Sequence, residues 1–157
     1  KSTLFNRLTH ARVQTADKLF TTLDSTSRQM SVGYPCKVIF SDTVGFIKKL
    51  PHQLVESFKS TLEEVAEADL LLHVVDCTDP ELDSIIAQTR TVLEEINAGD
   101  IPYLMVYNKT DAYPDFTLPR ENGSRGLAVS ALHQRGLAAL KAEIISYSTR
   151  FARERQL

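Results

Sequence analysis

The sequence predicts an α/β fold, specifically a three-layer α/β/α domain with a mostly parallel sheet. Short apolar runs typical of strands alternate along the chain with segments whose apolar residues recur at helical spacing. This alternation is typical of a parallel sheet that helices cover on both faces. With 157 residues and 43% apolar content, the chain is long enough for one hydrophobic core. We therefore treat residues 1–157 as a single domain.

The N-terminal third predicts a helix, a loop and a hairpin. Residues 1–8 are expected to form the first turns of a helix. Residues 9–28 have no period and are rich in Thr, Ser, Asp and Gln, which predicts a loop. Residues 29–33 and 37–42 resemble strands and flank Tyr34-Pro35, which predicts an antiparallel hairpin at the edge of the sheet.

The rest of the chain predicts alternating helices and strands. Apolar residues at helical spacing indicate an amphipathic helix over residues 53–67. Asp79 followed by Pro80 predicts an N-cap and the first position of a helix that ends near Gly99. The remaining predicted elements are strands at 70–76, 103–107 and 127–129, a loop at 112–124 and a closing helix at 136–153.

The first residues, Lys1-Ser2-Thr3, match the end of the phosphate-binding loop G-x-x-x-x-G-K-[ST]. In that loop the lysine reaches the β- and γ-phosphates and the next hydroxyl binds Mg²⁺, so we assign Lys1 to the phosphates and Ser2 to the metal. Backbone amides of the helix that follows, Thr3 included, would hold the phosphates. The glycines of the loop and the first strand are missing from the chain. A strand missing between the strands at 37–42 and 70–76 would leave a gap in the sheet, so we expect an N-terminally truncated part of a longer protein.

Two further motifs follow apolar strands. Asp42 ends one strand and precedes Gly45, which suits a metal-side carboxylate and an amide that can approach a γ-phosphate.

The second motif, residues 108–111 with sequence NKTD, suits a site that reads a nucleotide base. The Asp111 carboxylate would accept hydrogen bonds from N1 and N2 of guanine. Asn108 would tie neighbouring loops together, and the aliphatic stem of Lys109 would cover the base. Ser130 and Ala131, after the last strand, would offer backbone N–H groups to guanine O6.

Together these motifs resemble the translational GTPase-like class of P-loop proteins and, within it, the HflX family. The stretches that carry this resemblance are LFTTLD at 19–24, DTVGFI at 42–47, LPH at 50–52 and the helix segment at 56–63. The resemblance implies a P-loop GTPase domain that hydrolyses GTP to GDP with Mg²⁺. It also implies a bacterial protein that binds the RNA and protein of the large ribosomal subunit and splits or rescues stalled ribosomes under stress. An additional N-terminal domain and a linking helical region are implied as well.

The family pattern makes Thr22 the switch threonine that contacts Mg²⁺ and the γ-phosphate, with Thr21 as the second candidate. Lys1, Thr22 and Gly45 are then the expected catalytic residues. Phe46 stands where many GTPases have a glutamine that orients the attacking water, and a phenyl ring neither donates nor accepts a hydrogen bond. The water must therefore be positioned otherwise, and the resemblance implies that the ribosome stimulates hydrolysis.

Net charge, apolar stretches and the spacing of cysteines and histidines limit which other classes of protein the sequence fits. A formal net charge of −2 does not indicate a polyanion-binding domain. The longest apolar stretch, residues 70–75, is too short to span a membrane, and we expect a monomeric cytoplasmic protein. Cys36 and Cys77 match no metal or redox spacing and are interpreted as packed or incidental thiols. The four histidines form no ligand spacing, and His52, beside the switch, is the one to test.

Two alternatives to a GTP-hydrolysing ribosome factor stay open on the sequence. The first is a nucleotide-gated binding module with negligible turnover, because Phe46 replaces the water-orienting glutamine. The second is a truncated, nucleotide-free domain that acts through contacts alone, because the phosphate-loop glycines are missing.

Overall fold

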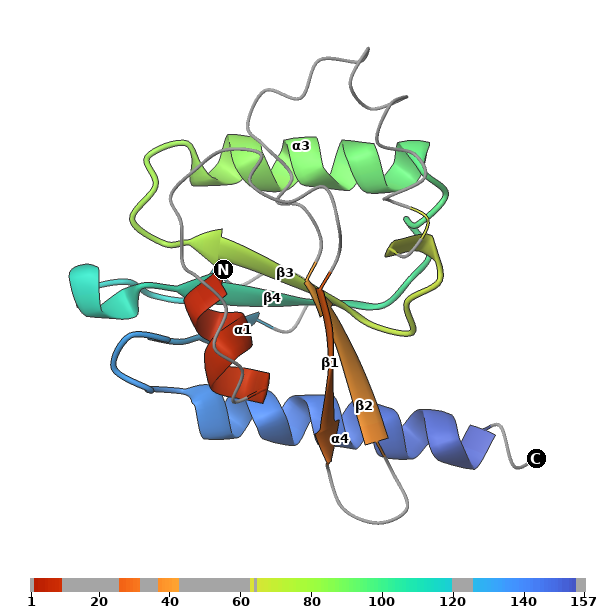
Figure 1. Ribbon diagram of the computed structural model, residues 1–157. Helices are drawn as coiled ribbons and strands as arrows, with labels where there is room; N and C mark the ends of the chain where they lie inside the picture. Colours follow the sequence, from red (N-terminus) through yellow and green to blue (C-terminus); the bar gives the residue numbers. More distant parts are fainter. Residues whose placement is uncertain are drawn as a thin grey trace.

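The computed structural model describes residues 2–9, 26–31, 37–42, 63, 65–119 and 126–154. The elements are α1 (Ser2–Thr9), β1 (Thr26–Ser31), β2 (Lys37–Asp42), β3 (Leu71–Asp76), α3 (Leu82–Glu95), β4 (Tyr103–Asn108), the 3-10 helix η1 (Thr110–Ala112), β5 (Gly126–Ala128) and α4 (Leu137–Glu154). Figure 1 shows α3 on one face of the sheet that contains β3 and β4, and α4 on the other. The predicted α/β/α layering is therefore confirmed.

The described strands form two sheets. Strands β3, β4 and β5 are parallel and lie in the order β3-β4-β5, with Asp76 opposite Asn108 in the register. Strands β1 and β2 form an antiparallel pair, which confirms the predicted hairpin. Among the described strands this pair is a sheet of its own and not the predicted edge of the parallel sheet. The prediction of a loop over residues 9–28 is wrong at its end, because residues 26–28 belong to β1. These polar residues pair one for one with β2, and Arg28 lies opposite Phe40, so strand pairing outweighs their composition.

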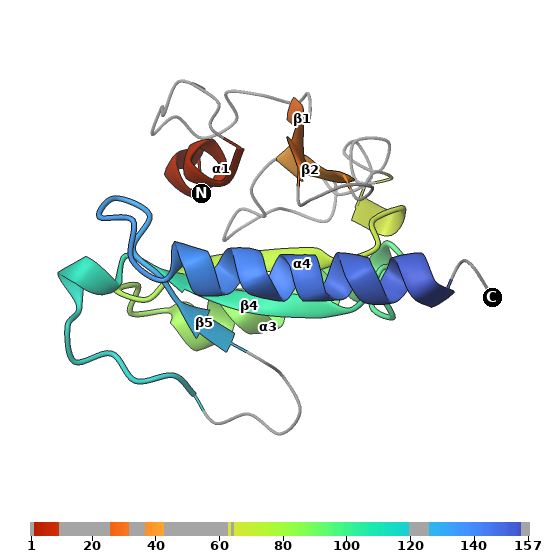
Figure 2. The same ribbon diagram turned by 90° about the horizontal axis from the view of Figure 1, so that it is seen from below.

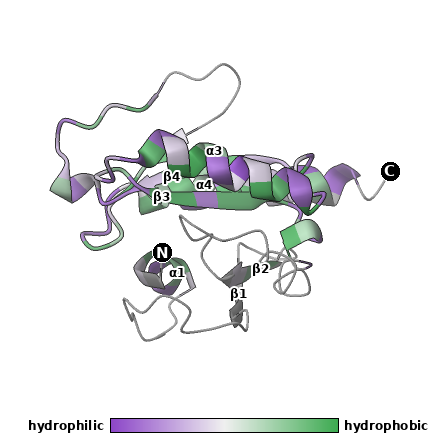
Figure 3. Ribbon diagram, turned by 90° about the horizontal axis from the view of Figure 1, so that it is seen from above, coloured by the Kyte–Doolittle hydropathy of each residue, from purple (hydrophilic) through white to green (hydrophobic). Residues whose placement is uncertain are grey.

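The central strand β4 faces two hydrophobic layers, because side chains alternate between the faces of a strand. Leu104 and Val106 belong to the core on the α4 side, whereas Met105 and Tyr107 belong to the core on the α3 side. Strand β3 is less buried: only Val75 is buried and the other residues of β3 are half-buried. This difference follows from the position of β3 at the end of the three-stranded sheet. Figure 3 shows that much of the ribbon of these two strands has the colour of hydrophobic residues.

The core on the α4 side also includes α1 and the hairpin. Its buried residues are Leu4, Leu8, Leu104, Val106, Val129, Ala131, Leu137, Leu140 and Ile144. Half-buried Val38 and Phe40 of β2 pack against this cluster. Figure 2 shows α1 and the hairpin beside α4. The shared core therefore fixes the predicted phosphate-side helix next to the end of the parallel sheet.

Helix α3 lies on the opposite face and starts later than predicted. Its cap residue is Glu81, not Asp79. The Glu81 backbone N–H donates to Asp79 Oδ1 at 2.9 Å, so Asp79 stabilises the turn before the helix. Thr89, which is buried within α3, satisfies its hydroxyl by donating to the Ile85 carbonyl at 2.9 Å. The helix therefore buries this polar group on the sheet without losing a hydrogen bond.

Two further sequence predictions concern the helices. Most of the predicted helix at 53–67 lies outside the described residues, and within it residues 63, 65 and 66 are helical. In the ranges that the structure covers, no helix combines the length and apolarity needed to cross a bilayer.

Gly136 supplies a backbone conformation that the turn before α4 requires. Its φ is 74°, and a Cβ at this position would lie 2.5 Å from the Ala128 carbonyl oxygen. We expect Gly136→Ala to lower the free energy of unfolding by about 2 kcal/mol or more, because left-handed backbone costs about 1–2 kcal/mol before this collision is added. Gly99→Ala is the matched control, because the nearest atom to its new Cβ is the movable Glu94 Cγ at 3.2 Å. Urea unfolding followed by circular dichroism measures both, and equal losses would contradict the role of Gly136.

His73 in β3 makes the stability sensitive to mild acid. Burial, aided by the positive charge of Arg90, lowers the pKa of His73 from 6.5 to about 4. Well above pH 6.5 the His73 imidazole is neutral in both the folded and the unfolded chain. Between pH 6.5 and pH 4 the unfolded chain binds a proton that the folded chain excludes, which favours unfolding. From pH 7 to pH 5 the wild type should lose about 2 kcal/mol more than His73→Gln in urea unfolding. An identical pH dependence of the two proteins would contradict this account.

Candidate functional site

The polar residues predicted to read a base meet at the carboxyl-terminal edge of the parallel sheet. Asn108 ends β4, and Ser130 and Ala131 follow β5. The Ala131 backbone N–H donates to Asn108 Oδ1 at 3.0 Å, and both residues are buried. Asn108 thus ties two loops that are 23 positions apart in sequence, as predicted.

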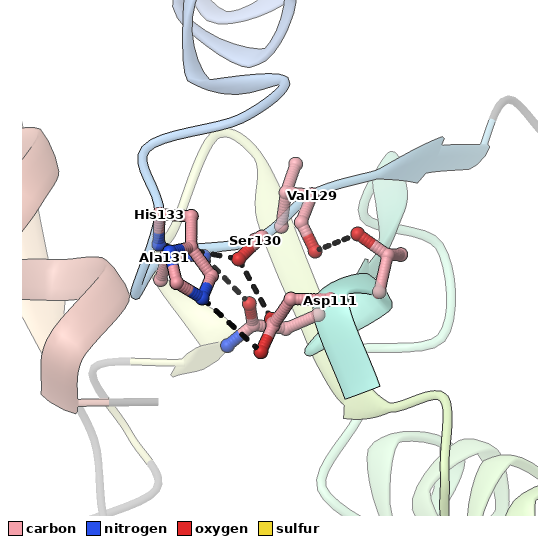
Figure 4. A network of polar contacts seen from close by, with 7 residues as sticks. Asp111, Val129, Ser130, Ala131 and His133 are labelled. Atoms are coloured by element: carbon pink, nitrogen blue, oxygen red, sulfur yellow. Dashed lines mark hydrogen bonds and ion pairs between the residues drawn. The ribbon is translucent and has the colours of Figure 1, made fainter. Parts of the chain in front are cut away.

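Figure 4 shows Asp111 pointing toward Ser130 and His133. The Ser130 hydroxyl donates to Asp111 Oδ1 at 2.7 Å, and the Asp111 Oδ2 atom lies 3.8 Å from His133 Nε2. The His133 backbone N–H in turn donates to Ser130 Oγ at 3.2 Å. Ser130 is 0% exposed, so its hydroxyl is a fixed, dry contact for the carboxylate. Sequence reasoning missed this hydroxyl, because it assigned only the backbone of Ser130.

The carboxyl group of Asp111 is ionised at neutral pH. The hydrogen bond from Ser130 lowers the pKa of Asp111 most, and His133 and Arg135 lower it further, while partial burial opposes them. An ionised carboxylate has acceptors and no donor. The group can therefore recognise a ligand edge that presents two N–H donors side by side.

The backbone N–H groups of Ser130 and Ala131 already have acceptors within the protein. The Ser130 N–H donates to the Arg135 carbonyl at 2.9 Å, and the Ala131 N–H donates to Asn108 Oδ1. A contact from either group to guanine O6 would require its present hydrogen bond to be shared or exchanged.

Thr110 fastens the loop after β4 to the end of β5. Its hydroxyl donates to the Val129 carbonyl at 3.0 Å, and its backbone N–H approaches the same oxygen at 3.3 Å. Lys109, just before it, has a φ of 66°, a left-handed conformation that turns the chain sharply out of β4. No role was assigned to Thr110 from the sequence. Its place inside the motif at 108–111 is the signal that could have identified it.

Lys109 forms an ion pair that the sequence did not predict. Its Nζ lies 2.8 Å from Asp76 Oδ2 at the end of β3. The sequence held one signal for this pair: Asp76 is an acidic residue at the end of an apolar strand. That strand, β3, lies beside β4, which Lys109 follows.

The predicted phosphate and metal residues are described only in part. Helix α1 begins at Ser2, and Thr3 is half-buried in its first turn, while Asp42 is the last residue of β2. Lys1, Thr22 and Gly45 lie outside the described residues, as do the side chains of Ser2 and Asp42. Thr21, Cys36, Phe46 and His52 lie outside the described residues as well. Cys77 is a buried free thiol whose pKa burial raises, as expected of a packed cysteine.

Comparison with known proteins gives consistent matches. A family model described as 50S ribosome-binding GTPase matches residues 1–109. GTPase HflX of Alkalihalophilus pseudofirmus is 47% identical over 144 residues, which cover 92% of this chain and 34% of that protein. GTPase HflX of Escherichia coli is 53% identical over 116 residues, which cover 74% of this chain and 27% of that protein. The chain thus spans about a third of the length of these curated relatives.

Solved structures give the same fold. A GTP-binding protein from Sulfolobus solfataricus, crystallised in complex with GDP, superposes with a TM-score of 0.75 at 25% identity. The match covers 96% of this chain and 49% of that one. The predicted P-loop α/β fold is confirmed. On these matches, the chain belongs to the 50S ribosome-binding GTPase family and, within it, to the GTPase HflX proteins.

Proposed function

We propose that this chain is the nucleotide-binding domain of a GTPase that hydrolyses GTP to GDP and acts on the large ribosomal subunit. The observation that carries the proposal is the ionised Asp111 carboxylate, which the Ser130 hydroxyl holds at the carboxyl-terminal edge of a parallel sheet. Ligands of open α/β sheets bind at this edge. Guanine presents N1–H and N2–H donors on one edge, so it matches an acceptor-only carboxylate.

The residues around Asp111 would complete the base site. Asn108 supports the loop through its hydrogen bond to Ala131. The Lys109 stem would cover the base, and backbone N–H groups of Ser130 and Ala131 would meet guanine O6. An adenine ring has an acceptor at N1, so a carboxylate at this position would disfavour it.

The phosphates of the nucleotide would lie away from Asp111, at the start of α1. Lys1 would bind the β- and γ-phosphates, amides including that of Thr3 would hold them at the start of α1, and the Gly45 amide would approach the γ-phosphate. Ser2, Thr22 and Asp42 would hold Mg²⁺, since hydroxyl and carboxylate oxygens are its preferred protein ligands. The bound ion would neutralise charge on the phosphate oxygens.

The match of residues 1–109 to the family model described as 50S ribosome-binding GTPase supports the larger role. Ribosome splitting or rescue under stress, as a monomer in the cytoplasm, is our proposal for the intact protein that contains residues 1–157 as its GTPase domain. Phe46 lacks a group that orients water, so the intact protein should hydrolyse GTP slowly until a large subunit completes the site.

The first test concerns the choice of base. In the intact protein, Asp111→Asn should weaken GTP binding by about 1.5–3 kcal/mol, because the amide replaces an acceptor with a donor. The same change should improve binding of xanthosine triphosphate, whose C2 oxygen accepts a hydrogen bond. Dissociation constants for both nucleotides measure the effect. Asp115→Asn, an exposed carboxylate of the following loop, is the control and should bind GTP as the wild type does. Unchanged GTP affinity in Asp111→Asn would refute the base assignment.

The second test concerns hydrolysis. Large ribosomal subunits should raise the single-turnover rate of phosphate release about a hundredfold, which needs only about 2.7 kcal/mol of transition-state stabilisation. Thr22→Ala should lose most of the stimulated rate, because it removes the proposed hydroxyl contact to the metal and γ-phosphate. Phe46→Ala should keep the basal rate, since the phenyl ring takes part in no proton transfer.

Two outcomes would contradict ribosome activation. One is a fast basal rate that subunits leave unchanged, and the other is a basal rate that collapses in Phe46→Ala while nucleotide binding persists. Negligible turnover both with and without subunits, at full nucleotide affinity, would instead support a nucleotide-gated binding module.

A further inference from the structure

Asp76 is a carboxylate at the same sheet edge that lies outside the four-residue base motif. It is the last residue of β3 and lies opposite Asn108 in the parallel register. One of its oxygens, Oδ1, accepts from the Thr78 backbone N–H at 2.9 Å and from the Thr78 hydroxyl at 2.6 Å. The other, Oδ2, lies 2.8 Å from Lys109 Nζ. One oxygen therefore fixes the carboxylate to its own turn, and the other holds the lysine.

The backbone of Lys109 directs its side chain toward β3. Its left-handed φ of 66° follows directly on β4, and its Nζ reaches the neighbouring strand at Asp76. The aliphatic stem consequently runs along the sheet edge from the end of β4 to the end of β3. A lysine stem without such an anchor populates many rotamers and loses that freedom when it packs on a ligand.

Both members of the pair are charged at neutral pH. Burial raises the pKa of Asp76, but hydrogen bonds from Lys109 and Thr78 outweigh it and lower the pKa below its usual value. The Lys109 side chain is 58% exposed and that of Asp76 is 32% exposed, so water weakens the attraction. The pair is thus suited to orient a side chain and contributes little to the stability of the fold.

We propose that Asp76 is a positioning residue for guanine nucleotides, which holds the Lys109 stem in place to cover the base that Asp111 reads. This inference rests on the proposed function. It adds a specific role for a residue on the neighbouring strand, whose carboxylate contacts Lys109 and Thr78.

The test is a double-mutant cycle in the intact protein with GDP as the probe. Asp76→Asn keeps the shape and the acceptor for Thr78 but loses the charge that holds Lys109. It should weaken GDP binding about three- to fivefold, mainly through faster dissociation. Lys109→Met keeps an apolar stem without the charge. The double variant should bind GDP within twofold of Lys109→Met alone, because Asp76 acts only through the lysine. Asp83→Asn, an exposed carboxylate in the first turn of α3, is the matched control and should match the wild type.

The outcomes separate this inference from the proposed function. Wild-type GDP affinity in Asp76→Asn would overturn the inference, as would a full additional loss in the Lys109→Met background. Either result would leave guanine recognition intact if the wild type still prefers GDP to xanthosine diphosphate. Absence of that preference would overturn both. If Asp76→Asn melts at a lower temperature, Asp76→Glu decides: binding within twofold of the wild type supports the role of the charge, and binding as weak as in the Asn variant overturns it.

Discussion

The hydrogen bond between Asn108 Oδ1 and the Ala131 N–H is the interaction on which the polar edge depends. Parallel strands bring their carboxyl ends to one side of a sheet, but they do not fix the loops that follow. The buried amide of Asn108 links the loop after β4 to the loop after β5, and Thr110 repeats this link through the Val129 carbonyl. With both links in place, the Ser130 hydroxyl and Asp111 Oδ1 lie 2.7 Å apart.

The hydrophobic core on the α4 side includes residues of this edge. Val129 and Ala131 belong to the same buried cluster as Leu4 and Leu8 of α1. The loop that carries Ser130 therefore rests on the helix that the sequence assigns to the phosphates. Because protein interiors are close-packed, a displacement of α1 would also displace Ala131 and so disturb its hydrogen bond to Asn108. The two halves of the proposed nucleotide site thus share one packed core.

Much of this arrangement was predicted from the sequence, because hydrophobic periodicity and strand-end motifs depend only on residues close together in the chain. The hairpin, the three parallel strands and the proximity of Asn108 to Ala131 follow from such patterns. The ion pair of Lys109 with Asp76 was not predicted, because the sequence shows the acidic end of the strand but not the register that sets Asp76 opposite Asn108. The polar composition of residues 26–28 likewise indicated a loop, since pairing with β2 is not visible in a single segment.

The long sequence separation of the polar contacts also affects when they form during synthesis. Ser130 contacts Asp111 across 19 positions, and Ala131 contacts Asn108 across 23. At the usual pace of translation, on the order of 5–20 residues per second, residues 108–111 are made roughly one to four seconds before Ser130 and Ala131. The same delay separates the emergence of β4 and β5 from the ribosome, and until β5 follows, the Asp111 carboxylate has no buried hydroxyl to orient it. A nascent chain therefore acquires the geometry of this proposed base site in a late step, after most of its apolar residues have been made.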